Sequence, residues 1–281
     1  MFTRSASSED HVSSHSPALL FVPAMGVPAT YYRPFVEQLE FRGYPVTFVD
    51  CDISSKATGS AGRGGYAEIV EDRIRSRFRV AEASVPTGRV VVLGHSLGGQ
   101  LGLVFAGGFE PEVPVILIGS GSAFFGGFAA PRKWVYLIVS QAIAGLSVLL
   151  GSWPGHRLGF AGRQTKRTMC DWARNVRTGR YGSRNSSFDY GVALRGFRGP
   201  LAVINIAGDL LAPPSTTTRL TDRTGAAVLR RATYSPRRAR RRPGSHFTWA
   251  RDVPGVVPQI IEWLSDPDFI APADHEREEF R

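Results

Sequence analysis

The sequence RVVVLGHSLGG at residues 89–99 decides the fold of this chain. Its opening run, RVVVL, is mostly branched and apolar, as in a buried strand, and a glycine-rich helical pattern follows over 97–107. Between them, GHSLG at 94–98 matches the pattern G-x-S-x-G. A strand, a sharp turn and a helix in that order form the setting in which this pattern raises a serine hydroxyl above a parallel sheet.

Ser96 is therefore expected to be a nucleophile on a strained turn. Glycine is expected at Gly94 and Gly98 because side chains two positions before and after Ser96 would collide across the turn. Gly99 and Gly102 would let the helix pack closely on the strands. The alternative is a glycine-rich turn with an idle serine, and the flanking strand and helix argue against it.

Short apolar runs alternate with helical patterns on both sides of this motif. Such alternation is typical of βαβ units around a buried parallel sheet. The expected strands cover 18–22, 46–49, 89–93, 113–118, 201–206 and 227–231. The expected helices cover 31–42, 67–82, 97–107 and 256–264. The sequence thus predicts an α/β fold with a mostly parallel, doubly wound sheet.

The alternation breaks after the fourth predicted strand, where we expect an inserted helical lid. Its segment 134–155 carries no Asp, Glu, Lys or Arg. Serines and glycines dilute the run of about 20 apolar residues that a membrane span needs, so a buried or membrane-touching lid helix is favoured. The expected organisation is a disordered leader at 1–16, a core at 17–120 and 200–265, the lid at 121–199 and a charged tail at 266–281.

An acid and then a histidine are expected downstream of Ser96. Asp209 directly follows the fifth predicted strand and its Ala-Gly extension, whereas no carboxylate follows the fourth. His246 lies in a loop of small residues before the last predicted helix, and His275 lies in the charged tail. We expect Asp209 to orient His246, which would take the serine proton and return it to a leaving group.

Other candidates for these roles are weaker. Asp50 and Asp222 are alternative acids, and Asp209 also suits a simple turn. His95, beside the expected nucleophile, is expected to pack rather than to act. His156 falls in the expected insertion.

An oxyanion at the substrate carbonyl needs two hydrogen-bond donors. One is expected to be the backbone N–H of Leu97, at the start of the helix. The other is expected from the loop PAMG at 23–26, after the first strand. Pro23 has no N–H, so Met25 is favoured and Ala24 is the reserve. A plain strand-to-helix turn is the alternative for this loop.

Taken together, these motifs resemble the α/β-hydrolase superfamily over about residues 17–265. The resemblance is closest to a bacterial group of α/β hydrolases without an assigned substrate. It rests on PAMG with the following Tyr-Tyr pair, GHSLGGQ, PGHRLG, Trp172 and Tyr181. It implies serine-dependent acyl transfer to water. The sequence departs from the usual pattern at 51–54, where CDIS replaces Arg-Gly, and in the short segment before the first loop.

The chain is basic, with a formal net charge of +10 and a pI near 10.2. Only three of its 34 basic residues are lysine, which indicates a compositional bias more than a selected phosphate-binding face. An arginine cluster at Arg230, Arg231 and 237–242 suits an acidic substrate, such as an acyl-coenzyme A thioester or a carrier protein, or is a solvated loop. Nucleic-acid binding is not favoured, because no aromatic residues interleave these arginines.

Composition sets the remaining expectations. The two cysteines give neither a disulfide framework nor a zinc spacing, which predicts a reducing, cytoplasmic location. No motif for a metal, nucleotide or flavin is visible, so no cofactor is expected. Apolar residues in the lid favour an apolar acyl substrate, and the leading hypothesis is hydrolysis of a carboxylic ester or thioester. The alternatives are an acyltransferase with the same triad and a non-catalytic, hydrolase-like binding protein.

Overall fold

Six strands form the central sheet of the computed structural model, which describes residues 16–51, 64–235 and 245–270. Every neighbouring pair in this sheet is parallel. In sheet order the strands are β2 (Val46–Phe48), β1 (Ala18–Val22), β3 (Val90–His95), β4 (Val115–Ile118), β7 (Leu201–Ile206) and β8 (Leu229–Tyr234). The predicted α/β fold is confirmed, and β1 and β7 have the predicted bounds.

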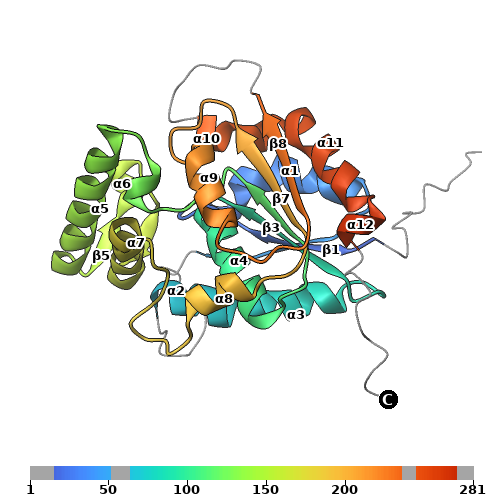
Figure 1. The fold of residues 1–281 in the computed structure, drawn as a ribbon, viewed down its shortest axis with the longest axis horizontal. Helices are drawn as coiled ribbons and strands as arrows, with labels where there is room; N and C mark the ends of the chain where they lie inside the picture. The colour runs from blue at the N-terminus through green and yellow to red at the C-terminus, as the bar shows by residue number, and fades with distance from the viewer. Residues whose placement is uncertain (1–15, 52–63, 236–244, 271–281) are drawn as a thin grey trace, which may run out of the picture.

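Helices cover both faces of this sheet because its strands are apolar on both sides. Leu20 and Val22 of β1 belong to one buried cluster, and Leu19 and Phe21 belong to the other, as the alternation of side chains along a strand requires. The first face carries α2 (Gly65–Ala67), η1 (Glu68–Ile74), α3 (Arg75–Ala83), α4 (Leu97–Phe109) and α8 (Tyr190–Gly196). The second carries α1 (Ala29–Phe41), η3 (Trp249–Arg251), α11 (Val253–Leu264) and α12 (Pro267–Ile270). Figure 1 shows these two layers with the sheet between them.

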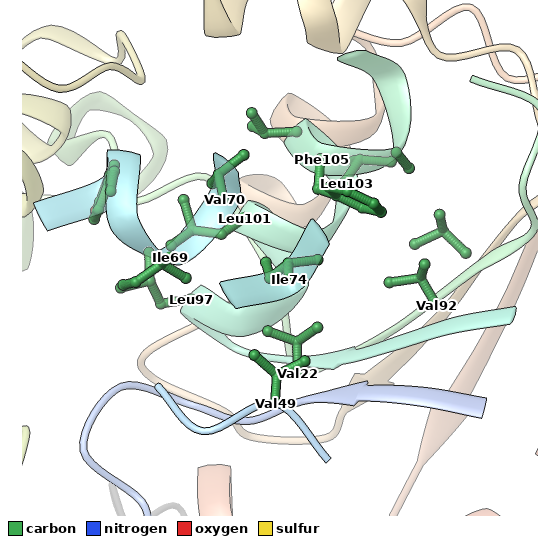
Figure 2. Packing of buried hydrophobic residues seen from close by; sticks show 14 of the residues in the cluster. Val22, Val49, Ile69, Val70, Ile74, Val92, Leu97, Leu101, Leu103 and Phe105 are labelled. Atoms are coloured by element: carbon green, nitrogen blue, oxygen red, sulfur yellow. The ribbon is translucent and has the colours of Figure 1, made fainter. Parts of the chain in front are cut away.

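Helix α4 is the most deeply buried helix of the first layer. Leu101 and Phe105 of α4 lie among Ile69, Val70 and Ile74 of the segment that precedes β3 (Figure 2). That segment was predicted as one helix over 67–82, and it is helical over 65–83 with seven residues of π-helix in its middle. This packing holds the middle of α4 against the helical segment that precedes β3.

A separate lobe connects β4 to β7, and Figure 1 shows it beside the sheet. We call η2 (Phe125–Gly127), α5 (Arg132–Leu149), β5 (Ser152–Pro154), α6 (Gly155–Leu158), β6 (Arg163–Thr165) and α7 (Lys166–Thr178) the lobe. Its two short strands pair antiparallel, which the sequence did not predict. Within the described residues, no helix combines the length and the apolar character needed to cross a membrane.

Two segments beside the expected boundaries pack with the sheet layers. Helix α8 lies in the stretch expected as lid, yet it packs on α4 so closely that a Cβ at Gly107 would come within 2.0 Å of the Ala193 carbonyl oxygen. The charged tail was expected from 266, yet Phe269 and Ile270 of α12 are buried in the second cluster. Both segments carry apolar side chains that the sheet layers bury. The remainder of the expected leader and tail lies outside the described residues, apart from Ser16.

Candidate active site

Ser96 occupies a strained turn between β3 and α4. Its backbone has φ 55° and ψ −125°, a conformation that non-glycine residues rarely adopt. A Cβ at Gly94 would lie 2.3 Å from the Gly99 Cα, so the predicted collision across the turn explains this glycine. Gly98 is required for a different reason, because a Cβ there would lie 2.1 Å from the Pro23 carbonyl oxygen of the neighbouring loop. The strained turn therefore sits directly against the loop that follows β1.

The strand order explains why this loop and Ser96 meet. The chain enters at β1, adds β2 on one side and then crosses to β3 on the other. A crevice forms where the order reverses, outside the carboxyl ends of β1 and β3. Met25 and Leu97, whose N–H groups were expected to hold an oxyanion, both line the cavity beside Ser96. The Ala24 N–H donates instead to the Tyr32 hydroxyl at 3.1 Å, so Ala24 is not an available reserve donor.

Asp209, His246 and Ser96 form a continuous line of hydrogen bonds. The His246 Nδ1 lies 2.6 Å from Asp209 Oδ2, and the His246 Nε2 lies 2.8 Å from the Ser96 hydroxyl oxygen. The other Asp209 oxygen accepts from the backbone N–H groups of Leu211 and Ala212, at 2.8 and 3.1 Å. Because the Asp209 carboxylate is held in this way, the His246 Nδ1–H donates to it, and Nε2 is the acceptor for the serine proton.

The elements that carry these side chains are short. Asp209 follows β7 in a turn that Gly208 begins with φ 75°. His246 lies in α10 (Ser245–Thr248), a single helical turn just before η3. Asp209 and His246 are buried, with 4% and 1% of their surfaces exposed. The structure thus brings the three expected residues together at the carboxyl edge of the sheet.

His95 has more contacts than the simple packing that the sequence suggested. Its Nδ1 lies 2.7 Å from the Tyr32 hydroxyl, and its Nε2 lies 3.0 Å from the backbone carbonyl of His246. Burial, and to a smaller extent the nearby His246, lower the pKa of His95 well below its ordinary value, so the ring is neutral. The His246 carbonyl is the nearer of two groups at Nε2; the tautomer that satisfies it and Tyr32 has Tyr32 donating to Nδ1 and Nε2–H donating to the His246 carbonyl.

This arrangement is a relay from the loop after β1 to the backbone of His246. The Ala24 N–H donates to Tyr32, Tyr32 to His95, and His95 to His246. The indole of Trp249 packs edge-on against His95, with ring centroids 5.0 Å apart, and its N–H lies 3.2 Å from His95 Nε2. Sequence reasoning missed this relay. The alternation along β3 was a usable signal, because His95 lies on the same side of the strand as Leu93, which faces α1.

A cavity of about 630 Å³ opens beside the Ser96 hydroxyl. The central domain contributes Met25, Leu97, Gln100, Leu211 and His246 to its wall, and the lobe contributes Tyr136, His156, Phe160, Ala161 and Trp172. The two sides touch, because a Cβ at Gly26 would lie 1.9 Å from the Ala161 carbonyl oxygen. Most of the wall is apolar. Gln100 is a polar exception, and its Oε1 accepts from the Tyr181 hydroxyl at 2.8 Å.

The other expected binding residues lie apart from this cavity. Arg230 forms an ion pair with Asp266, and Arg231 donates to the Thr221 hydroxyl at 2.8 Å. The arginines at 237, 238 and 240–242 lie outside the described residues. Among the described residues, no group of three or more His, Cys, Asp or Glu side chains is placed to hold a metal ion. Cys51 is buried, which raises the pKa of its thiol to about 12.

The parallel sheet, with Ser96 on a strained turn between β3 and α4, has the α/β-hydrolase fold. Solved structures with this fold match most of the chain. A metagenome-derived lipolytic enzyme is 13% identical, covers 89% of this chain and 93% of its own, and has a TM-score of 0.58. A soluble variant of monoglyceride lipase from Saccharomyces cerevisiae is 14% identical, with 89% and 86% covered and a TM-score of 0.59.

A third structure extends the range of chemistry among these similar folds. The enol-lactonase from Burkholderia xenovorans LB400 is 16% identical, with 90% and 92% covered and a TM-score of 0.53. No family model and no curated protein matches the sequence. At these identities the similarity shows the shared fold.

Proposed function

We propose that this protein is a serine hydrolase that cleaves a carboxylic ester or thioester with an apolar acyl group. The observation that carries the proposal is the hydrogen-bonded line from Asp209 through His246 to Ser96, which ends in the cavity. A buried carboxylate, an oriented imidazole and a serine on a strained turn are the components of nucleophilic acyl transfer. The names of the similar structures, which include lipolytic enzymes and a lactonase, agree with an ester substrate.

The first half of the reaction forms an acyl-enzyme. His246 Nε2 takes the Ser96 proton while the serine oxygen attacks the carbonyl carbon and makes a tetrahedral intermediate. The N–H groups of Met25 and Leu97 donate to its oxyanion, and the start of α4 adds a favourable dipole. His246 then gives the proton to the leaving alcohol or thiol as its bond to the carbon breaks. The acyl group stays on Ser96.

The second half uses water in place of the alcohol or thiol. Water attacks the acyl carbon while His246 removes one of its protons. His246 then returns a proton to the Ser96 oxygen as the bond between that oxygen and the acyl carbon breaks and the acid leaves. Asp209 stabilises the imidazolium at both stages. The relay through His95 positions the backbone of His246, because the His95 ring donates to the His246 carbonyl.

The lobe acts as a lid in this proposal, and the apolar wall that it shares with the central domain favours an acyl chain over a polar one. The same triad would also serve transfer to an alcohol or an amine. Hydrolysis predicts free acid as the product even when an acceptor is added. The two free cysteines agree with a reducing compartment, and we place the protein in the cytoplasm.

The test of the proposal is labelling with a fluorophosphonate, which reacts with activated serines. We expect labelling of the wild-type chain and none of Ser96→Ala, with hydrolysis of p-nitrophenyl esters lost in parallel. A panel of acyl-chain lengths and acyl-coenzyme A thioesters then separates ester from thioester substrates. Equal labelling of the two proteins would show that Ser96 is not the nucleophile.

A further inference from the structure

The outer side of helix α5 is apolar and faces water. Val135, Ile138, Val139, Leu146 and Leu149 are 58, 67, 48, 47 and 82% exposed. Their spacing of three, four and seven residues places them on one side of the helix. Leu150 just beyond α5 and Leu158 at the end of α6 add further exposed apolar surface, at 62 and 61%. We call these seven residues the outer face; Figure 1 shows α5 at the far side of the lobe from the sheet.

The opposite side of α5 packs into the lobe through Tyr136 and Ile143 and also holds polar groups. Ser140 and Ser147 are fully buried and donate to backbone carbonyls of their own helix, at 2.7 and 2.6 Å. The Gln141 amide donates to the Ala173 carbonyl of α7 at 2.9 Å, which attaches α5 to the lobe. A helix of a water-soluble domain normally presents polar side chains to water, whereas α5 presents apolar ones. The exposed apolar side of α5 therefore matches a non-aqueous partner.

Charge selects the kind of partner. Between residues 113 and 188 the only acidic residue is Asp171, which is buried, and there are ten basic residues, a balance of 10 − 1 = +9. The basic residues are Arg132, Lys133, Arg157, Arg163, Lys166, Arg167, Arg174, Arg177, Arg180 and Arg184. Two copies of such a region would repel one another, whereas an anionic surface would attract it.

The start of α5 combines the two properties. Trp134 is 51% exposed, and the Lys133 ammonium lies 5.1 Å from the centre of its ring. An amphipathic ring beside a long basic side chain is the arrangement found at the boundary between lipid and water. Arg157 and Leu158 of α6 place a basic and an apolar side chain next to each other, and both are exposed.

We propose that the outer face docks on an anionic lipid bilayer, with α5 lying in the plane of the bilayer surface. The attachment to α7 through Gln141 leaves one side of α5 available to lipid, which fits a helix that lies on the membrane rather than across it. The same lobe lines the cavity through Tyr136 of α5 and His156 of α6. Docking would bring the cavity to the bilayer, but the binding itself does not depend on the proposed hydrolysis.

The test uses the full chain with Ser96→Ala, so that binding is measured without turnover. We expect it to sediment with vesicles of phosphatidylcholine and phosphatidylglycerol, and to bind pure phosphatidylcholine vesicles at least tenfold more weakly. Each lysine or arginine near an anionic membrane is expected to strengthen binding by roughly fivefold at low salt. High salt should weaken the binding for the same reason.

A matched pair of variants separates the outer face from exposed apolar residues elsewhere. Ile138→Gln with Leu149→Gln is expected to reduce binding to the anionic vesicles by about tenfold or more. Phe41→Gln with Val80→Gln removes two side chains that are 81 and 50% exposed on α1 and α3, and should leave binding within twofold. Near-ultraviolet circular dichroism checks that both proteins are folded. Equal binding of the two variants would refute the proposal.

Trp134 offers a second measurement. The other four tryptophans, Trp153, Trp172, Trp249 and Trp263, are each no more than 5% exposed, so Trp134 is the residue whose fluorescence responds to an added surface. Its emission should shift to the blue with anionic vesicles and should be quenched by brominated lipid. Light scattering tests whether a second copy of the chain occupies the outer face instead. If the chain is a dimer that Ile138→Gln with Leu149→Gln dissociates, and if it does not bind vesicles, the outer face is a dimer interface and the proposal is overturned.

Discussion

The turn at Ser96 and helix α5 are built by opposite rules. Around Ser96, glycines stand where any side chain would strike neighbouring backbone, and polar atoms that are buried have specific partners. Along α5, apolar side chains project into water, and a Cβ at Gly145 would meet nothing within 4 Å. The residues around Ser96 are therefore fixed by their neighbours inside the domain. The exposed side chains of α5 have few such neighbours, so their character reflects the surface that the lobe would contact.

Buried carboxylates provide the first way to test this contrast. Asp209→Asn should lower kcat/KM by about 10³- to 10⁴-fold, because asparagine no longer stabilises the imidazolium or fixes the tautomer of His246. Asp171 is the comparable carboxylate of the lobe: it is buried, its burial raises its pKa, and it accepts from the Tyr66 N–H at 3.0 Å. Asp171→Asn should change kcat/KM by less than about threefold, because it lies outside the proposed machinery.

Steady-state kinetics on one p-nitrophenyl ester measures both effects. Thermal unfolding of each variant supplies the control for folding. If Asp171→Asn lowered kcat/KM as strongly as Asp209→Asn, the lobe would belong to the chemistry and the contrast between the two regions would fail. If Asp209→Asn left kcat/KM unchanged, the proposed acid would be wrong.

Glycine substitutions test the same contrast through stability. Gly98→Ala should destabilise the protein by about 3 kcal/mol, because its Cβ would lie 2.1 Å from the Pro23 carbonyl oxygen and the backbone must shift. Gly145→Ala should stabilise it by roughly 0.5–1 kcal/mol, because alanine restricts the unfolded chain and favours helix in open space. Urea unfolding measures both changes. Equal effects would show that space at the glycine does not decide the outcome.

Sequence reasoning succeeded where local pattern and fold rules agree. The apolar runs of β1 and β7 gave the bounds of both strands, because a strand that is buried on both faces is apolar throughout. The order of serine, acid and histidine then selected three residues that the structure brings together. Met25, expected as an oxyanion donor because Pro23 has no N–H, lines the cavity, and its role stays a prediction.

The features that were missed depend on contacts between distant segments. The pairing of β5 with β6 involves three residues on each strand, too few to show an alternation. The relay needs Tyr32 from α1 and His95 from β3; the alternation along β3 indicates the face on which His95 lies but not its partner. The π-helical turn in η1 likewise leaves no pattern distinct from that of an α-helix. Each of these features is set by tertiary packing rather than by local preference.

A further expected effect concerns the neutral ring of His95. Its pKa is lowered by burial in the folded protein and returns to its ordinary value near 6.5 when the chain unfolds. The unfolded state therefore binds more protons below that pH, so this contribution to stability is fully present above about pH 6.5 and is lost as the pH falls. The loss should approach about 1.4 kcal/mol for each pH unit below 6.5.

Urea unfolding at pH 7.5 and pH 5.5 measures this loss. His95→Gln provides the comparison, because its side-chain amide can still donate to the His246 carbonyl but does not titrate. The variant should be less stable than the wild type at pH 7.5, since it loses the bond to Tyr32, but its stability should fall less between the two pH values. An identical pH dependence in the two proteins would mean that His95 is already protonated in the folded state, and the relay would then need the opposite donor at Tyr32.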